Sequence, residues 1–250
     1  MHIEWAEVSL TGDREDNQDR AAVAAGEGAA LLVVMDGMGG HAHGARAAEV
    51  GCKVMLELFR AEAKPLFDPL GFLHLAIGRA HAAVVAIGTR LAVDVRPRAT
   101  CAVCLVQRQE AYWAHVGDSR VYHMRGGSVV SRTRDHSHVE QLLRDGAIRE
   151  DEIPAHPMRN FVECCLGGEA MLPEMTISRR QALEDGDVLM VCSDGVWSNL
   201  KDAEIAALLK PHGHANGGYL PALEKLVERA VAASTPHSDN ATAASLVWRH

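Results

Sequence analysis

The sequence predicts an α+β fold in which helices pack in layers against β-sheet. Strand-like segments lie at both ends of the chain, over residues 1–35 and 239–248, and two long helical patterns follow the first of them. A run of short strands joined by tight turns occupies residues 100–130. Because each sheet and each helix must bury an apolar face, this order of elements favours layered packing around sheet.

The length and composition of the chain fit one folded domain. It has 250 residues, of which 48% are hydrophobic, so we expect a single domain over residues 1–250 with a large core. The formal net charge of −8 argues against a nucleic-acid partner held mainly through phosphate contacts. We expect no signal peptide at the N-terminus and no apolar run that approaches a membrane span. The expected protein is therefore a cytoplasmic monomer with reduced cysteines.

The first third of the chain predicts short strands followed by two helices. Residues 31–35 form a continuous apolar run, which is typical of a strand buried on both faces. Residues 44–62 and about 68–92 then carry apolar side chains at helical spacing. The predicted buried face of the first helix contains Ala47, Val50, Gly51, Val54, Met55 and Leu58, and that of the second contains Leu70, Leu73, His74, Ile77, Val84, Val85 and Leu91.

The middle of the chain predicts four strands in succession. Their turns lie at residues 107–110, 117–119 and 126–127. Cys101 and Cys104 have the spacing of a zinc-binding pair, but they share one predicted strand, so their side chains point to opposite faces. With no second such pair in the chain, we do not expect a zinc site.

The second half of the chain begins with a polar segment, residues 136–168, which contains prolines and scattered charges. Residues 187–192 predict another buried strand, which ends close to an acid. Helices are expected near residues 202–210 and 220–233, and a strand closes the chain.

The stretch LLVVMDGMGGHAHG, residues 31–44, ends a buried strand on Asp36 and then turns glycine-rich. A phosphate-binding P-loop is a weak interpretation, because the loop lacks the Gly-Lys-Ser/Thr ending. A strand-to-helix turn in which Asp36 accepts a local hydrogen bond is the simplest interpretation. A metal site is the third, and it predicts further carboxylates of the same kind elsewhere.

Four more acids stand at the ends of predicted strands. Asp118 and Asp239 lie in turn sequences. Asp194 follows an apolar run, as Asp36 does, and Asp19 precedes a strand-like segment. Each of them also fits a local role as a turn residue or a helix cap.

Convergence of these acids would create a need for cations. Two carboxylates about 4 Å apart repel each other by roughly 4 kcal/mol at an effective dielectric constant near 20. A ligand set made only of oxygen selects Mg²⁺ or Mn²⁺ over zinc. Two such ions roughly 3.5–4 Å apart can activate a water for attack on phosphorus. Arg14, five residues before Asp19, offers a planar fork for phosphate oxygens.

A set of motifs stands in a familiar order along the chain: GDREDNQD, DGMGGH, ATCAV, VGDSRVY, TRDHS, HPMRN, GDVLMVCSDGVW and DNAT. From about residue 8 to 248, the chain resembles the metal-dependent protein phosphatases, the protein phosphatase 2C family. Its compact length and the DGMGGH motif are similar to the bacterial branch that opposes Hanks-type Ser/Thr kinases. The resemblance implies a four-layer α-β-β-α sandwich, with two antiparallel sheets packed face to face and helices outside each.

The resemblance also implies a set of metal ligands. Asp36 is expected to bridge two catalytic Mn²⁺ or Mg²⁺ ions and to be essential for catalysis. The carbonyl of Gly37 is expected to bind one of these ions. Asp194 and Asp239 are expected to complete the protein ligands of the other.

Further residues receive roles from the same resemblance. Asp19 is expected to hold metal-bound waters from behind the ligands. Arg14 is expected to grip the substrate phosphate and to take part in catalysis. Asp118, together with Asp194, is expected to bind a third, weaker metal ion. Residues of about 136–168 are expected to form a flap beside the active site.

The chain departs from the family pattern at several positions. Met38 stands where eukaryotic members carry a His proposed as the general acid, which leaves the proton donor open. His115, Ala99 and Cys101 replace a common Asn, a frequent Gly and a frequent Thr. The remaining unusual features are the flap segment FVECCLGG, whose vicinal Cys164 and Cys165 fit packing or a redox or metal role, and the pair His41 and His43, which fits surface histidines or a metal site.

The implied function is hydrolysis of phosphoserine and phosphothreonine in proteins by attack of metal-activated water. The expected partners are a Ser/Thr kinase and its phosphorylated substrates. Two alternatives remain: a non-catalytic module that binds phosphoproteins, and a metal-dependent phosphatase of small molecules. The presence of Asp36, Asp194 and Asp239 argues against the non-catalytic alternative.

Overall fold

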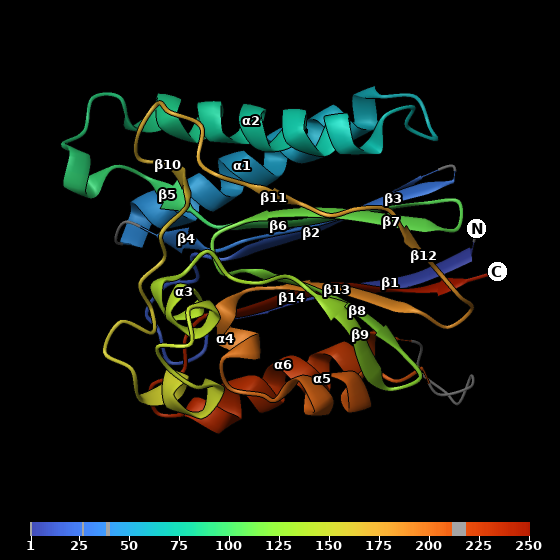
Figure 1. Ribbon diagram of the computed structural model, residues 1–250. Coiled ribbons are helices and arrows are strands. Elements are labelled where there is room, and N and C mark those ends of the chain that lie inside the picture. Colours follow the sequence, from blue (N-terminus) through green and yellow to red (C-terminus); the bar gives the residue numbers. More distant parts are fainter. Residues whose placement is uncertain (1, 27, 39–40, 212–218) are drawn as a thin grey trace.

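The computed structural model describes residues 2–26, 28–38, 41–211 and 219–250. It has a mixed α/β fold with antiparallel sheets and helices, which confirms the predicted class (Figure 1). Gly39 and Gly40 of the glycine-rich loop, and the side chain of His41, lie outside what the structure describes.

The first sheet contains the long apolar strand before Asp36 as an interior strand. Its strand order is β11-β7-β6-β3-β2, with β12 paired to β7, and every pairing is antiparallel. These strands are β2 (Arg20–Gly26), β3 (Ala29–Met35), β6 (Cys101–Gln107), β7 (Glu110–Val116), β11 (Thr176–Ile177) and β12 (Gln181–Ala182).

The second sheet joins the two ends of the chain. Its order is β1-β14-β13-β8-β9, and β1 pairs with β14 along its whole length. Its strands are β1 (His2–Leu10), β8 (Arg120–Arg125), β9 (Ser128–Arg132), β13 (Val188–Cys192) and β14 (Ala241–Arg249). A small third sheet consists of β4 (Gly37–Met38), β5 (Arg98–Ala99) and β10 (Leu166–Gly167).

Helices cover the outer faces of the two large sheets (Figure 1). Helices α1 and α2 pack on the first sheet, whereas α5 and α6 lie against the second. The helices are α1 (His41–Ala61), α2 (Pro69–Gly88), α3 (His138–Arg144), α4 (Asp194–Trp197), α5 (Asp202–Leu208) and α6 (Leu220–Ser234), with short 3-10 turns at η1 (Val93–Val95) and η2 (Glu150–Ala155).

Strand β3 contributes to two hydrophobic clusters because its side chains alternate between its faces. Leu31, Val33 and Met35 pack with the cluster that includes α1 and α2. Leu32 and Val34 pack with side chains of the second sheet instead. All seven residues of β3 are buried, which confirms the predicted strand covered on both faces. The strand therefore holds the residue that follows it rigidly.

The predicted elements are found close to their expected bounds, including the four successive strands and the helices near 202–210 and 220–233. Cys101 and Cys104 lie in different clusters, as expected from their opposite orientation. All six cysteines are free.

The predicted buried face of α2 is partly wrong. Leu70 is 39% exposed and His74 is exposed, whereas Phe72, Ala76 and Ala80 are buried. Nearly every position of this helix is apolar or small, so its periodicity does not single out one face. By length and composition α2 also passes as a membrane span, contrary to expectation, although its buried residues pack in the core.

A buried ion pair ties β8 to the start of β13, far from the cavity described below. The fully buried Asp187 accepts hydrogen bonds from Arg125 Nε at 2.7 Å and Nη2 at 2.8 Å, and pairs with His123 Nε2 at 2.8 Å. Burial alone would raise the pKa of Asp187, but the hydrogen bonds from Arg125 and His123 outweigh burial and hold it well below its usual range.

We predict that Asp187→Ala lowers the free energy of unfolding by about 3 kcal/mol or more at pH 7, because it leaves buried donors unpaired. Since the pKa of Asp187 is depressed on folding, its stabilising contribution is present above about pH 4 and is lost as the pH falls further. Urea denaturation measures the effect. The exposed Asp185→Ala is the control and should change stability by less than about 0.5 kcal/mol. Equal losses in both variants would contradict the prediction.

Candidate active site

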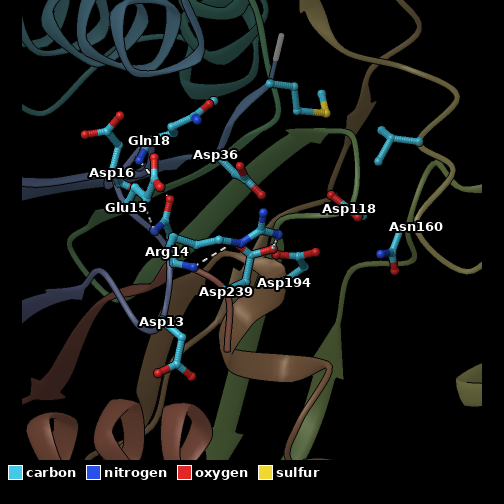
Figure 2. A pocket seen from close by; sticks show the side chains of 14 residues that line it. Asp13, Arg14, Glu15, Asp16, Gln18, Asp36, Asp118, Asn160, Asp194 and Asp239 are labelled. Atoms are coloured by element: carbon cyan, nitrogen blue, oxygen red, sulfur yellow. Dashed lines mark hydrogen bonds and ion pairs between the residues drawn. The ribbon is translucent and has the colours of Figure 1, made fainter. Parts of the chain in front are cut away.

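The acids singled out in the sequence surround one cavity of about 450 Å³ (Figure 2). Segments far apart in the chain meet there at the same end of the two large sheets. Asp19 lies behind this cavity rather than in its wall. The lining residues are Asp13, Arg14, Glu15, Asp16, Gln18, Asp36, Gly37, Met38, Asp118, Asn160, Val162, Asp194, Asp239 and Asn240.

Asp36 leaves the end of β3 and is fixed through its backbone. Its N–H donates to Thr100 Oγ1 at 3.3 Å, and its carbonyl accepts from the N–H of Thr100 at 2.8 Å. Gly37 follows in β4, where a Cβ atom would lie 2.1 Å from the carbonyl oxygen of Gly44. The close approach of α1 to this strand therefore requires glycine at position 37.

Asp118 lies in the turn between β7 and β8. Its carbonyl oxygen accepts a hydrogen bond from the indole N–H of Trp197 at 2.9 Å. The residue is only 6% exposed, and its carboxylate Oδ1 has no hydrogen-bond partner among the described residues. A buried carboxylate oxygen without a partner is costly, which suits a position where a cation binds.

Asp194 and Asp239 come from neighbouring strand ends in the second sheet. Asp194 is the first residue of α4, directly after Ser193 at the end of β13, and Asp239 precedes β14. Glycine at 195 lets α4 approach closely, because a Cβ atom there would lie 2.0 Å from the carbonyl oxygen of Asn240. This packing brings the two carboxylates to the same wall of the cavity.

Asp19 is 2% exposed and accepts a hydrogen bond from Ser193 Oγ at 2.7 Å. Burial, followed by the charges of Asp194 and Asp239, raises the pKa of Asp19 to about 7. The hydrogen bond from Ser193 connects it to the backbone that carries Asp194.

The carboxylates repel one another across the cavity. Burial is the first cause that raises the pKa of Asp36 well above its usual range, and the charges of Asp19, Asp194, Asp118 and Asp239 add to it. Burial and the charge of Asp194 likewise raise the pKa of Asp118. Divalent cations would relieve this repulsion.

The donor set fits Mn²⁺ or Mg²⁺, because it offers carboxylate oxygens, a backbone carbonyl and room for water. Over the ranges that the structure describes, however, no three His, Cys, Asp or Glu side chains are drawn together tightly enough to hold an ion as they stand. The acids line the cavity without closing on one another, as expected for like charges that repel.

Arg14 lies at the cavity and pairs with Asp239, its Nη2 lying 2.6 Å from Asp239 Oδ2. The Arg14 side chain is 60% exposed and that of Asp239 is 41% exposed, so this ion pair contributes little to stability. Its guanidinium is accessible from solvent and can turn to another anion.

The polar segment 136–168 borders the cavity. Asn160 and Val162 line the cavity, whereas side chains of α3 and η2 line a second, larger one. This second cavity, of about 1070 Å³, adjoins the first and shares Arg14, Asp118, Asn160, Asp194 and Asp239 with it. It runs between the segment 136–168 and helices α4 and α5.

Most of the residues that depart from the family pattern lie in surroundings that indicate a structural role. Met38 lines the cavity and pairs with Arg98 in the small sheet. His115 is buried and stacks on His136, with ring centroids 4.4 Å apart. Cys164 and Cys165 are half-buried free thiols whose pKa is raised mainly by burial, which favours the packing interpretation over a reactive one. His43 is exposed.

Several supporting residues were not singled out from the sequence. Each of them is either adjacent to a motif acid in the chain or hydrogen-bonded to one. They are Thr100, Ser119, Ser193, Trp197 and Asn240. All five stand within the motifs ATCAV, GDSR, CSDGVW and DNAT, so motif membership was the available signal.

Comparison with known proteins identifies related sequences. Residues 11–238 match the family model of protein phosphatase 2C. The serine/threonine protein phosphatase PstP of Mycobacterium tuberculosis is 30% identical over 230 residues, which cover 92% of this chain and 41% of that protein. The putative protein phosphatase 2C-type of Streptococcus pyogenes is 32% identical over 190 residues, covering 73% of this chain and 74% of the relative.

Solved structures show the same likeness over nearly the whole chain. The M. tuberculosis phosphatase PstP/Ppp superposes with a TM-score of 0.83 at 28% identity, covering 99% of both chains. The S. agalactiae serine/threonine phosphatase gives 0.86 at 26% identity, covering 100% of both. The catalytic domain of PstP in complex with two manganese ions gives 0.81 at 27% identity, covering 99% of both.

We predict that, in EDTA, Asp194→Asn becomes more stable relative to the wild type as the pH rises. Burial and the charge of Asp239 raise the pKa of Asp194 to about 6 on folding, so ionisation destabilises the folded protein increasingly from about pH 4 to 7. The advantage of the variant should grow by about 2 kcal/mol between pH 4.5 and 7.5 in urea denaturation.

The comparison with the wild type is essential to this measurement. Burial, followed by the charge of His136, lowers the pKa of His115 to about 4, which makes absolute stability rise with pH over part of the same range. The difference between the two proteins cancels that contribution. A difference that is constant with pH would show that Asp194 ionises as freely in the folded state as in the unfolded one.

Proposed function

The chain belongs to the protein phosphatase 2C family, and we propose that it hydrolyses phosphoserine and phosphothreonine in proteins with Mn²⁺ or Mg²⁺ as cofactor. The observation that carries this proposal is the convergence of Asp36, Asp118, Asp194 and Asp239 on one cavity with Arg14. The chain spans 41% of the length of the mycobacterial relative named above, so the substrates and partners of the whole protein are part of the proposal.

The chain's carboxylates would hold the ions. Asp36, the carbonyl of Gly37, Asp194 and Asp239 would supply the protein ligands of two ions, and Asp118 with Asp194 would hold a third, weaker one. Asp19 lies behind the cavity and would support the metal ligands through the hydrogen bond that it accepts from Ser193 Oγ. When bound, such ions supply Lewis acidity that activates water and neutralises charge on phosphate oxygens.

Arg14 would bind the substrate phosphate. Its planar guanidinium suits two phosphate oxygens, and its present partner, Asp239, is a proposed metal ligand. Substrate binding would therefore exchange one anion for another at Arg14, without burying a charge that lacks a partner.

We propose that the arrangement of elements is the four-layer α-β-β-α sandwich of the family. The apolar clusters between α1/α2 and the first sheet, between the two sheets, and between the second sheet and α4–α6 support this order. Residues 1–250 would form a single catalytic domain with a flap at about 136–168. The protein would work as a cytoplasmic monomer on phosphoproteins and would oppose a Hanks-type Ser/Thr kinase.

We predict that turnover of a phosphothreonine peptide requires Mn²⁺ or Mg²⁺ and disappears in EDTA. Asp36→Ala and Asp239→Ala should each reduce turnover by a factor of about 100 or more, because each removes a ligand. The control is Asp185→Ala, an exposed acid at the opposite end of the second sheet, which should retain wild-type turnover. Steady-state assays with and without EDTA make the measurement.

The same assays separate the competing functions. Tight binding of the phosphopeptide without turnover would favour a non-catalytic module. Turnover of small phosphate esters but not of phosphopeptides would favour a small-molecule phosphatase. Full activity in EDTA would overturn the metal-dependent proposal.

We predict that Arg14→Ala raises KM for the phosphopeptide about 10-fold, and that it also lowers kcat if the contact tightens in the transition state. Calorimetric titration should show Mn²⁺ affinity that is unchanged or higher, because the substitution frees Asp239 from its ion pair. Arg180→Ala is the matched control, since Arg180 forms an exposed ion pair with Glu110 far from the cavity. A loss of Mn²⁺ binding in Arg14→Ala would contradict the role given to Arg14.

A further inference from the structure

Two hydroxyl groups that are entirely buried connect the backbones beneath Asp36 and Asp118. Thr100 Oγ1 and Ser119 Oγ lie 2.7 Å apart, and both residues are 0% exposed. Hydroxyl pairs in such a dry environment form strong, directional hydrogen bonds, and either partner is costly to leave unpaired.

Thr100 is bound to Asp36 on one side of this pair. It lies between β5 and β6, and its N–H donates to the carbonyl oxygen of Asp36 at 2.8 Å. Its Oγ1 accepts from the N–H of Asp36 at 3.3 Å. Because a hydroxyl can accept one hydrogen bond and donate another, the O–H of Thr100 remains available for Ser119.

Ser119 lies on the other side, directly after Asp118 in the turn between β7 and β8. The preceding Gly117 has a φ of +95°, and the methyl group of Thr100 fills the space beside it, 2.7 Å from where a Cβ atom would stand. Thr100 therefore contacts both ends of the three-residue turn that presents Asp118.

The carboxylate of Asp118 needs such support. Its Oδ1 has no partner among the described residues, and the like charges of Asp36 and Asp194 face it across the cavity. Repulsion would push the turn outward unless its backbone were held. Trp197 holds the carbonyl of Asp118, and the hydroxyl pair holds the next residue.

We propose that Thr100 and Ser119 are positioning residues whose hydroxyl pair fixes Asp118 at a set distance from Asp36. The inference rests on the proposed phosphatase function. The hydroxyl pair would fix the third, weaker metal site relative to the paired site. An ion held by Asp118 would then keep a constant position relative to the substrate phosphate. Neither residue contacts the substrate.

Two substitutions at Thr100 separate its hydroxyl from its methyl group. Thr100→Val keeps the shape and removes the hydroxyl, whereas Thr100→Ser keeps the hydroxyl and removes the methyl. We expect Thr100→Val to weaken the lower-affinity Mn²⁺ binding seen by calorimetry about 10-fold, and to move the Mn²⁺ dependence of kcat to higher concentrations by a similar factor. Thr100→Ser should restore both values to near wild type.

Ser119→Ala is the second variant, which keeps the proposal testable if Thr100→Val fails to fold. It should produce the same shift in Mn²⁺ dependence. Combining it with Thr100→Val should add little to the effect of Thr100→Val alone, because that substitution already breaks the hydrogen bond between Thr100 and Ser119.

A matched control comes from another buried hydroxyl pair, Tyr219 and Ser245, whose oxygens lie 2.8 Å apart beside α6. Ser245→Ala should lower Tm without moving the Mn²⁺ dependence. If Thr100→Val and Ser119→Ala also lower Tm only, or if Thr100→Ser is as impaired as Thr100→Val, the positioning role is wrong. Calorimetry reads metal binding without turnover, so this failure is distinct from an inactive wild type, which would overturn the proposed function instead.

Discussion

Mutual repulsion among the acids at one end of the two sheets is the constraint on which the rest of the structure depends. Asp36, Asp118, Asp194 and Asp239 come from four separate parts of the chain, and each stands at the end of a strand or turn whose backbone is buried. A flexible loop would let such charges drift apart. Strands packed on both faces resist this, so part of the stabilisation from the core offsets the repulsion between the like charges.

The groups that make this arrangement tolerable are small and polar. Ser193 donates to Asp19, Trp197 to the carbonyl of Asp118, and Thr100 binds the backbone of Asp36. Each of them acts on the position of an acid, and the carboxylates of Asp36 and Asp118 remain directed at the cavity. Burial, together with the neighbouring acids, raises the pKa of Asp36 and Asp118, and their oxygens fit hard cations.

Local patterns were sufficient to predict most elements and to single out the acids. They were not sufficient to predict contacts between distant segments. The apolar run of β3 and the turns at 117–119 and 126–127 are each predicted by residues that are adjacent in the chain. The face that α2 buries was missed because alanines and leucines surround the helix almost evenly. Arg14 and Asp239 are 225 positions apart in the chain, so no local sequence pattern predicts their ion pair. The acids themselves were found because motifs in a fixed order imply a shared site, although spacing alone left a turn interpretation open for each.

The pairing of β1 with β14 has a consequence for engineering. His2 lies opposite Arg249, while Leu10 and Ala241 lie at the end of the sheet that carries the acids. The two described chain ends are therefore neighbours, roughly 30 Å along the strands from the cavity, since nine extended residues span about that length (Figure 1). A short linker between them would yield circular permutants whose new ends open at surface turns such as Gly126-Gly127. A reporter fused to either end would project away from the cavity.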